Sequence, residues 1–376
     1  MKFWFGRKAG RGAVRPSLFR AWGAAPSSGE WPRSYEAQVR EAYLGNPVAQ
    51  RAVRLVAETV AWAPLNALPG GAAAARALAL ARPVLLETAA SQLLLHGNAY
   101  LQILVDGEGQ PAELFALRPE RVKIEAGAGG WPDAYLYKAG EAKTRLPARD
   151  GLGRPSLVHI KAAHPLDDHY GLGCLGAAAG AVAIHNAATR WNKALLDNAA
   201  RPSGALVYAP GDGAVLADDQ YERLKSEIEA EFSGTANAGR PLLLDGGLKW
   251  EAMSLSPADM DFVGLKAAAA REIALAFGVP PMLLGLPGDA TYANYREANR
   301  ALWRLTVLPL GDKIAGAIAA ALAAWWPGLT LSLDVDQVTA LAEDRQMLWA
   351  QVSAADFLSR GEKREMLGFA AGKEEG

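Results

Sequence analysis

Two long helical segments that enclose a short stretch of alternating strand and helix signals constrain this chain more than any other feature of its sequence. The first, 172–200, reads GLGCLGAAAGAVAIHNAATRWNKALLDNAA and ends just before Pro202, because the residue that precedes a proline disfavours helix. The second, 257–277, is expected to begin with Ser256 as its N-cap and Pro257 in the first helical position. The chain must therefore enter and leave a small module through a pair of helices.

The segment between these helices, 201–256, carries the signals of a compact α+β unit. A helix is expected to start at a capping box formed by Asp219 and Glu222. Strands are expected on both sides of this helix, and the last two flank a tight turn at Asp245-Gly246-Gly247. The expected strands are Ala205–Tyr208, Pro241–Leu244 and Leu248–Leu255.

The region before the first long helix, about 33–165, also mixes helix and strand signals and predicts an α+β domain. Asn46-Pro47 opens a helical pattern whose valines recur on one face until Pro64, and a second helix, Pro83–His96, ends at Gly97. An apolar strand, AYLQILVD, follows the second helix. Further strands are expected near Glu113–Leu117, Val122–Glu125, Ala134–Tyr137 and Leu157–Lys161.

After the second long helix comes a loop rich in Gly and Pro, PPMLLGLPGDA, and then a further helical pattern from about Tyr292 to Trp326 with an expected bend at Pro309. A strand is expected at Leu329–Val335. Two C-terminal helices follow, and a capping box of Ser359 and Glu362 opens the last one.

Composition narrows the class of protein. With 376 residues, of which 51% are hydrophobic, the chain can bury a sizeable core, and its formal charge of -1 argues against a protein that coats DNA. Residues 1–32 are basic and are interpreted as a flexible arm. The single cysteine, Cys174, excludes an internal disulfide.

The apolar stretches Gly173–Ala188 and Ile314–Trp326 are shorter than the roughly 20 residues that cross a bilayer, so no membrane span is expected. A membrane-interface protein with Ala-rich helices remains a rival class.

Two motifs could carry chemistry. Gly171-Leu-Gly173-Cys-Leu-Gly176 matches GxGxxG, with Asp197 further on, and makes a nucleotide-binding oxidoreductase the main alternative, but no strand directly precedes these glycines. A set of possible metal ligands lies on a loop with no fixed face, where turn formation explains the residues equally well: His159, His164, Asp167, Asp168 and His169. Hydrolase and ATP-binding signatures are absent from the sequence. We expect no enzyme activity, no cofactor and no metal.

Several segments of the chain resemble the portal proteins of tailed phages, especially the siphovirus type, and their relatives in gene transfer agents. The matching segments include NPVAQRAVRLVAETVAWAPL, HGNAYLQILVD, LFALRPERVKI, LVHIKAAHPLDDHYGLGCL, SPADMDFVGLKAAAAREIALAFGVPPMLLG and TYANYREANRALWRLTVLPL. They occur in the expected order over about 40–326. The resemblance implies an α+β portal fold with an α+β wing, long stem helices, a small α+β clip and a short helical crown.

On this resemblance, each part of the chain takes a place in the portal architecture. The wing is 33–171 together with part of 278–335, the stem helices are 172–200 and 257–277, the clip is 201–256, the tunnel loop is 284–295, the long wing helix is 296–326, and the short crown and tail are 336–376. Such proteins form a ring, usually of twelve subunits, at one capsid vertex of the virion after assembly in the host bacterial cytoplasm. Double-stranded DNA passes through the ring, and the implied partners are the terminase motor, the head-tail adaptor and the major capsid protein.

The resemblance also implies which residues meet these partners. The tunnel-loop candidates for the DNA channel are Gly285, Pro287, Gly288, Asp289, Tyr292, Asn294 and Arg296. The stem candidates are Arg190, Lys193, Lys266 and Arg271. The candidates for docking at the clip are Tyr221, Arg223, Lys225 and Glu229. Subunit salt bridges are the alternative use of the stem residues, and an ordinary helix connection is the alternative for the loop.

Overall fold

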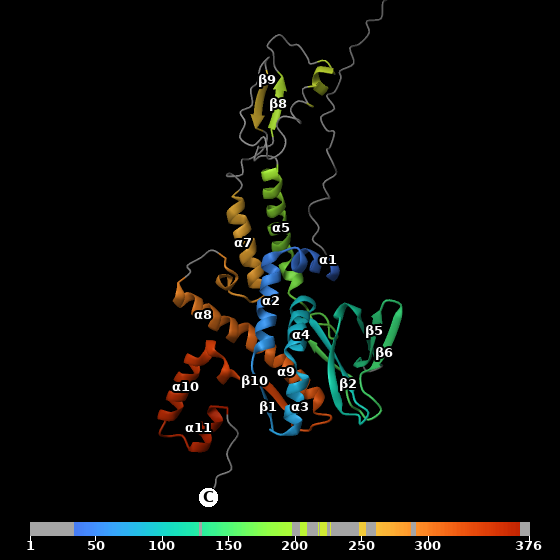
Figure 1. The fold of residues 1–376 in the computed structure, drawn as a ribbon, viewed down its shortest axis with the longest axis vertical. Coiled ribbons are helices and arrows are strands. Elements are labelled where there is room, and N and C mark those ends of the chain that lie inside the picture. The colour runs from blue at the N-terminus through green and yellow to red at the C-terminus, as the bar shows by residue number, and fades with distance from the viewer. Residues whose placement is uncertain are drawn as a thin grey trace, which may run out of the picture. The chain divides into compact units, whose positions relative to one another are not determined.

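A computed structural model describes residues 34–127, 130–197, 204–208, 217, 219–223, 226, 248–252, 261–286 and 291–368 (Figure 1). The chain divides into two units, Met1–Trp31 and Pro32–Gly376, and the account below concerns the second. The expected basic arm 1–32 and most of the segment 201–256 lie outside the described residues.

The first long helix of this unit begins where the sequence predicts. Helix α1 (Tyr35–Val39) and a π-helical turn lead to α2 (Pro47–Trp62), for which Asn46 is the N-cap. The Asn46 side chain accepts hydrogen bonds from the backbone N–H groups of Val48 and Ala49, both at 3.0 Å. Pro47 fits the first helical position because that N–H has no partner inside a helix.

Two three-stranded antiparallel sheets follow in the chain. The first has the order β3-β2-β7, and the second has the order β4-β5-β6. Helix α4 (Pro83–His96) ends at Gly97, whose φ of 83° suits glycine, and β2 starts at the next residue. The strands are β2 (Asn98–Val105), β3 (Pro111–Leu117), β4 (Val122–Ala126), β5 (Pro132–Ala139), β6 (Ala142–Pro147) and β7 (Leu157–Lys161). The expected strands near these positions are confirmed, whereas β6 was not expected.

The C-terminal part of the chain returns to the N-terminal part through strand pairing. Strand β10 (Thr330–Leu333) pairs antiparallel with β1 (Leu65–Leu68). Neither β1 nor helix α3 (Ala72–Leu80) was expected from the sequence. Before β10, the chain forms a continuous helix, Tyr292–Leu322, made of α8 (Tyr292–Leu302), a π-helical turn and α9 (Leu308–Leu322). Helices α10 (Ala342–Ala354) and α11 (Arg360–Met366) follow, and the capping box of Ser359 and Glu362 is confirmed.

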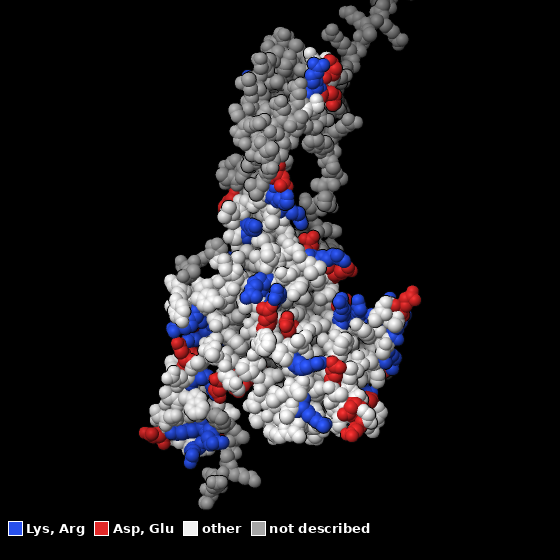
Figure 2. Space-filling model, viewed as in Figure 1, with Lys and Arg blue, Asp and Glu red and all other residues white. Residues whose placement is uncertain are grey.

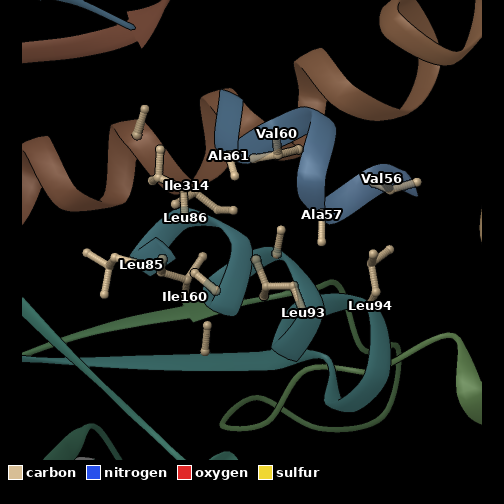
Figure 3. Close-up of a cluster of buried hydrophobic side chains, with 14 of the residues drawn as sticks. Val56, Ala57, Val60, Ala61, Leu85, Leu86, Leu93, Leu94, Ile160 and Ile314 are labelled. Atoms are coloured by element: carbon tan, nitrogen blue, oxygen red, sulfur yellow. The ribbon is translucent and has the colours of Figure 1, made fainter. Parts of the chain in front are cut away.

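One large apolar core joins these elements. Figure 3 shows residues of α2 and α4 facing one another, with Ile160 of β7 and Ile314 of α9 in the same cluster. Val56 and Ile314 have no exposed surface. Burial of side chains of this size supplies about 1.5–3 kcal/mol each, so this cluster carries much of the stability of the unit.

Helices α5 (Leu175–Asp197) and α7 (Phe262–Ala276) pack side by side, and Trp191 stacks on Phe262 with ring centroids 4.3 Å apart. Between them in the chain, β8 (Gly204–Tyr208) and β9 (Leu248–Ala252) form an antiparallel pair. The expected strands in these two places are confirmed, whereas the expected strand at 241–244 lies outside the described residues.

Two expected helix starts are wrong. Helix α7 begins at Phe262 with Asp261 as its N-cap, and the Asp261 carboxylate accepts from the Gly264 N–H at 3.1 Å, so Ser256 does not cap this helix. In the segment 201–256, Asp219 is already helical. The Gln220 side chain instead accepts from the Ala217 N–H, and Ala217 O receives the first helical hydrogen bond. In both places, the side chain that accepts a hydrogen bond from an N–H group at the helix start belongs to a different residue from the one that the local sequence pattern favoured.

The glycines of GLGCLG mark a close crossing of the backbone. A Cβ on Gly171 would lie 2.0 Å from Gly97 O, and a Cβ on Gly173 would lie 2.4 Å from Leu95 O. The buried Asn98 side chain accepts from Gly171 N at 2.7 Å and donates to Gly171 O at 3.1 Å. These glycines let the chain pass over the end of α4 and the start of β2, which explains them without a bound nucleotide.

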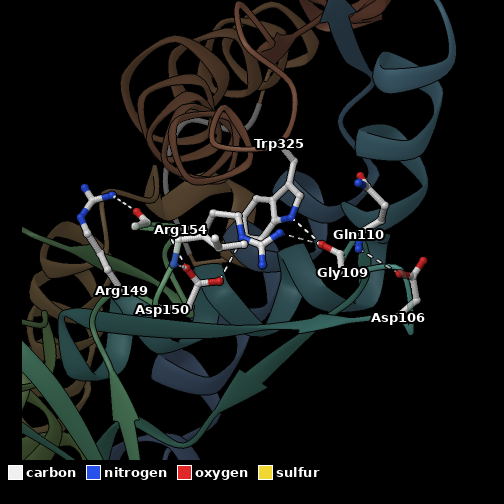
Figure 4. Close-up of polar contacts among 9 residues, drawn as sticks. Asp106, Gly109, Gln110, Arg149, Asp150, Arg154 and Trp325 are labelled. Carbon is white, nitrogen blue, oxygen red and sulfur yellow. Dashed lines mark hydrogen bonds and ion pairs between the residues drawn. The ribbon is translucent and has the colours of Figure 1, made fainter.

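A cluster of polar contacts connects the β2–β3 turn to Trp325, just after α9 (Figure 4). Trp325 donates its indole N–H to Gly109 O at 2.8 Å, and Arg154 donates to the same oxygen at 3.1 Å. The Arg154 guanidinium lies 5.2 Å from the Trp325 ring centroid and pairs with Asp150 at 2.9 Å. This cluster therefore joins the first sheet to the C-terminal half of the chain through side chains whose polar groups are paired with one another.

The core predicts a matched pair of valine substitutions. Val56→Ala in α2 should lower the free energy of unfolding by about 2 kcal/mol, because it removes two buried methyl groups and leaves a cavity. Val84→Ala, at a valine of α4 that is 74% exposed, should change it by less than about 0.5 kcal/mol. Urea unfolding followed by circular dichroism measures both, and equal losses would contradict the core assignment.

The glycine crossing predicts opposite effects within one motif. Gly173→Ala should destabilise the protein by about 1–3 kcal/mol, because its Cβ would overlap backbone atoms that have little room to move. Gly176→Ala, where no atom lies within 4 Å of the added Cβ, should leave stability unchanged or raise it by up to about 1 kcal/mol, since alanine favours helix. Thermal unfolding compares the two variants, and a stable Gly173→Ala protein would show that the crossing is looser than described.

Candidate functional site

The segment expected as a flexible loop, 284–295, is partly helical. A 3-10 turn, Pro281–Leu284, ends at Gly285 with φ 71°, and α8 begins at Tyr292. Thr291 is the N-cap of α8, and its hydroxyl accepts from the Asn294 N–H at 3.2 Å. Helix α8 therefore begins at Tyr292, where the sequence predicts a helical pattern, so Tyr292, Asn294 and Arg296 lie on this helix, and their role in the channel stays a prediction. Pro287, Gly288 and Asp289 lie outside the described residues.

The charged residues of α8 are engaged by the C-terminal helix α10. Arg296 pairs with Glu343 at 2.9 Å, and Arg300 pairs with Glu343 at 2.7 Å and with Glu297 at 3.1 Å. The Arg300 side chain is only 14% exposed, and its Nε lies 3.7 Å from an oxygen of Asp344. Sequence reasoning missed this cluster, because its members lie more than forty positions apart in the chain. Within one subunit, Arg296 is thus held by an acid rather than left free for DNA.

A π-helical turn, Trp303–Val307, lies just before Pro309, where the sequence predicts a bend. Leu308 donates its N–H to Trp303 O, five residues back. Proline has no N–H and its ring crowds the carbonyl four residues earlier, and the wider π turn relieves this crowding while the helix continues. Beside the turn, a hollow of about 430 Å³ separates this part of the helix from α10. Its lining residues are Arg304, Leu308, Val335, Leu341, Asp344, Arg345, Met347, Leu348 and Gln351.

The four stem candidates have different surroundings. Lys193 pairs with Asp197 at 2.6 Å within α5, so Asp197 serves an ion pair rather than a cofactor ribose. Arg190 and Arg271 are exposed, and Lys266 is half-buried. The charge of Lys266 and, more strongly, burial both lower the pKa of His185.

A buried group of polar side chains connects the middle of α5 to the start of α2. The Asn46 amide donates to Asn186 Oδ1 at 2.9 Å and lies 3.1 Å from His185 Nδ1. Asn186 in turn donates to the backbone carbonyl of Glu41 at 2.9 Å. Since buried amides need partners, these contacts fix the angle at which α5 leaves the core.

The candidates in the segment 201–256 are only partly described. Tyr221 and Arg223 are exposed on a short helical piece, where they are available to a partner. Lys225 and Glu229 lie outside the described residues.

The histidine and aspartate set is used in packing and turns. His159 stacks on Tyr100 with ring centroids 4.4 Å apart and bonds Asn98, and burial is the main cause that lowers its pKa to about 4. Asp167 accepts from the backbone N–H groups of His169 and Tyr170, as the turn interpretation expects. Among the described residues no group of three or more His, Cys, Asp or Glu side chains is placed to hold a metal ion.

The face shown in Figure 2 carries basic and acidic side chains side by side over most of the second unit. Most ion pairs among the described residues lie on exposed surface, such as Arg54 with Glu58 at 2.6 Å and Arg82 with Glu113 at 2.7 Å. A surface of this kind holds a polyanion weakly where its cations are already paired with acids.

One helix of the described part of the chain, Tyr292–Leu322, is long and apolar enough to cross a membrane, which the short apolar runs of the sequence did not suggest. A second candidate arises only if α3 and α4, bent by 57°, are taken together. Ile314, Ile318 and Leu322 of α9 are fully buried in the apolar core. The core helix of a folded domain passes the same test of length and composition.

Comparison with known proteins identifies the fold. A family model described as phage portal protein matches residues 47–368. A protein of Rickettsia felis is 40% identical over 347 residues, which cover 87% of this chain and 88% of that one. A probable portal protein of Streptomyces phage phiC31 is 26% identical over 329 residues, covering 80% of this chain and 67% of the relative. None of these matches supports the oxidoreductase alternative.

Solved structures agree with this assignment. A chain in the virion of a native gene transfer agent particle is 49% identical, with a TM-score of 0.68, and the match covers 91% of this chain and 96% of that chain. A chain in the neck of a native particle computed with C12 symmetry is 48% identical, with a TM-score of 0.67 and coverage of 91% and 95%. An HK97 family phage portal protein from Corynebacterium diphtheriae, 19% identical with a TM-score of 0.57, shares the fold over 82% of this chain and 99% of its own.

The expected α+β portal fold is therefore confirmed, and with it the interpretation of the chain as a structural protein rather than an enzyme. Because the family model spans most of its length, and because a relative of 40% identity matches it nearly end to end, the chain belongs to the phage portal protein family.

Proposed function

We propose that this portal protein is one of twelve subunits of a ring at a single vertex of a virion, and that DNA enters and leaves the particle through the ring. The observation that carries the proposal is the 48% identity, over 91% of the chain, to a chain in a gene transfer agent neck computed with C12 symmetry. At this level of identity, the surfaces that set the rotation between neighbouring subunits are expected to be shared.

Within this ring, the parts of the chain take the roles that the resemblance implies. The wing is 33–171 with part of 278–335, α5 and α7 belong to the stem, and 201–256 is the clip. The crown includes α10 and α11, which follow β10 in the chain. The pairing of β10 with β1 supports the inclusion of part of 278–335 in the wing.

The proposed channel works by geometry rather than by strong binding. A duplex that must slide should meet few unbalanced cations, because each neutralised phosphate raises affinity. Lys193 on α5 and Arg296 on α8 are each balanced by an acid of the same chain. Tyr292, at the start of α8, is 83% exposed, and its aromatic ring carries a polar hydroxyl group but no charge. Gly285, Pro287, Gly288 and Asp289, which precede it in the chain, complete the proposed tunnel loop.

The proposed partners are a terminase motor at the clip during packaging, a head-tail adaptor afterwards, and the major capsid protein around the ring. Assembly takes place in the host cytoplasm. Tyr221 and Arg223 support a docking role for the clip, because both are exposed and both residue types are enriched in protein interfaces.

The ring is tested by negative-stain imaging of the purified chain. We expect ring-shaped particles with a central hole and twelve-fold symmetry in top views. Analytical ultracentrifugation of the same sample should give the mass of twelve chains of 39.8 kDa. A chain that stays monomeric under every condition of salt and concentration contradicts the proposal.

The tunnel loop is tested by deletion of Gly285–Asp289. Rings should still form, because the described residues of this segment, Gly285 and Leu286, are not part of the large apolar core, but particles should package or retain less DNA. A length-matched Gly/Ser replacement of the same residues is the control that separates loss of reach from loss of particular side chains. Particles of the deletion variant with the normal DNA content would show that this loop is only a connection between helices.

A further inference from the structure

The sheet β4-β5-β6 has two unlike faces. Its strands pair with Val122 opposite Tyr137 and Ile124 opposite Tyr135, and these side chains join a small apolar cluster with Leu146. Because side chains alternate between the faces of a sheet, the residues between them in each strand lie on the other face. That outer face contains Lys123, Leu136 and Arg145 in one row across the three strands.

The outer face is basic. Lys138 of β5 lies directly opposite Lys143 of β6, on the same face as Lys123 and Arg145. All four side chains are exposed. Figure 2 shows Lys and Arg side chains gathered where Figure 1 places β5 and β6, with acidic atoms at the tip of the sheet. We name these four residues, Lys123, Lys138, Lys143 and Arg145, the basic face.

Only one cation of the basic face is balanced within the chain. Arg145 pairs with Glu125 at 2.8 Å and with Asp133 at 3.0 Å. Among the ion pairs of the described residues, none includes Lys123, Lys138 or Lys143, in contrast to the paired cations of α2, α5 and α8. Two lysines directly opposite each other destabilise an antiparallel pair. The sheet therefore holds a concentration of positive charge that its own folding does not explain.

The composition of the basic face favours phosphate over a protein surface. Protein interfaces are depleted of lysine and enriched in aromatic side chains at their centres, whereas nucleic-acid backbones are held mainly by Lys and Arg. The large apolar side chain on this face is Leu136, and it is only partly exposed. Lysines on neighbouring strands and at alternate positions repeat at about 5–7 Å, which suits a strand of closely spaced phosphates.

We propose that the outer face of the β4-β5-β6 sheet is a second, sequence-independent binding site for the phosphate backbone of double-stranded DNA, separate from the residues proposed to line the channel. Three free lysines make a weak and salt-sensitive contact, in keeping with a net charge of -1 for the whole chain. The proposal stands on the sheet alone and does not depend on how many subunits form the ring.

The test compares two triple charge reversals in the full-length chain. The first is Lys123→Glu, Lys138→Glu and Lys143→Glu on the basic face. The control is Arg76→Glu, Lys313→Glu and Arg360→Glu, which changes the net charge equally at exposed cations that also form no ion pair among the described residues. Fluorescence anisotropy measures the binding of a short labelled DNA duplex over a series of salt concentrations, and imaging reports ring formation for each protein.

The basic-face variant should bind the duplex at least about tenfold more weakly than the control at low salt, and the slope of log affinity against log salt should fall by about 2 to 3. Equal affinities for the wild type, the control and the basic-face variant would overturn the proposal. Competition by polyglutamate as effective as competition by unlabelled duplex would also overturn it, and would assign the face to an acidic protein instead. Rings formed by all three proteins separate this outcome from failure of the portal proposal.

A single substitution separates binding from stability. Lys138→Glu places an acid opposite Lys143, so the cross-strand pair should become favourable and the midpoint of thermal unfolding should stay the same or rise. The same substitution should weaken duplex binding. A variant that loses both stability and binding would indicate a structural role for Lys138 and would contradict the proposal.

Discussion

The close passage of the chain over Gly97 is the contact on which the arrangement of the stem helices depends. Gly171 and Gly173 cross the end of α4 at distances that leave no room for a side chain, and Asn98 bonds both backbone groups of Gly171. The Cys174 N–H also donates to Leu94 O at 2.8 Å. Because α5 starts at the next residue, this crossing and the contacts of Asn46 with Asn186 determine where the helix leaves the core.

The distribution of charge follows a simple pattern in most of the described chain. Several cations on the helices are paired with acids of the same subunit, as in the cluster of Arg296 and Arg300 around Glu343. Such pairs add little stability at exposed positions, but they leave little net attraction for a polyanion. The basic face of the second sheet departs from this pattern. A portal subunit that lets DNA slide past one surface and holds it weakly at another would use both arrangements.

The cluster around Arg300 also connects the long helix to the C-terminal helices. Arg300 is nearly buried, contacts acids on both α8 and α10, and lies one turn before the π-helical segment. A displacement of the start of α8 would therefore also displace α10. The portal fold thus joins the proposed tunnel region and the proposed crown through charged side chains as well as through the backbone.

Local signals in the sequence determined most of the secondary structure. Asn46-Pro47, Gly97 and the pair Ser359 and Glu362 marked helix ends that the structure has at the same residues, because caps act within a few positions. The two helices and the strands at 204–208 and 248–252 were predicted from the same kind of signal, although α7 starts later than expected. The portal family also followed from the sequence, because its segments recur in order along the chain.

Tertiary structure decided what depends on residues far apart in the chain. The pairing of β1 with β10, the partner of Arg296 and the role of the GLGCLG glycines could not be read from local pattern, since each needs a contact with a distant segment. The face on which Lys123, Lys138 and Lys143 lie together is another case, because strand register sets which lysines become neighbours. The sequence alone determined the elements and the family, and the packing of those elements decided which charges and which backbone atoms meet.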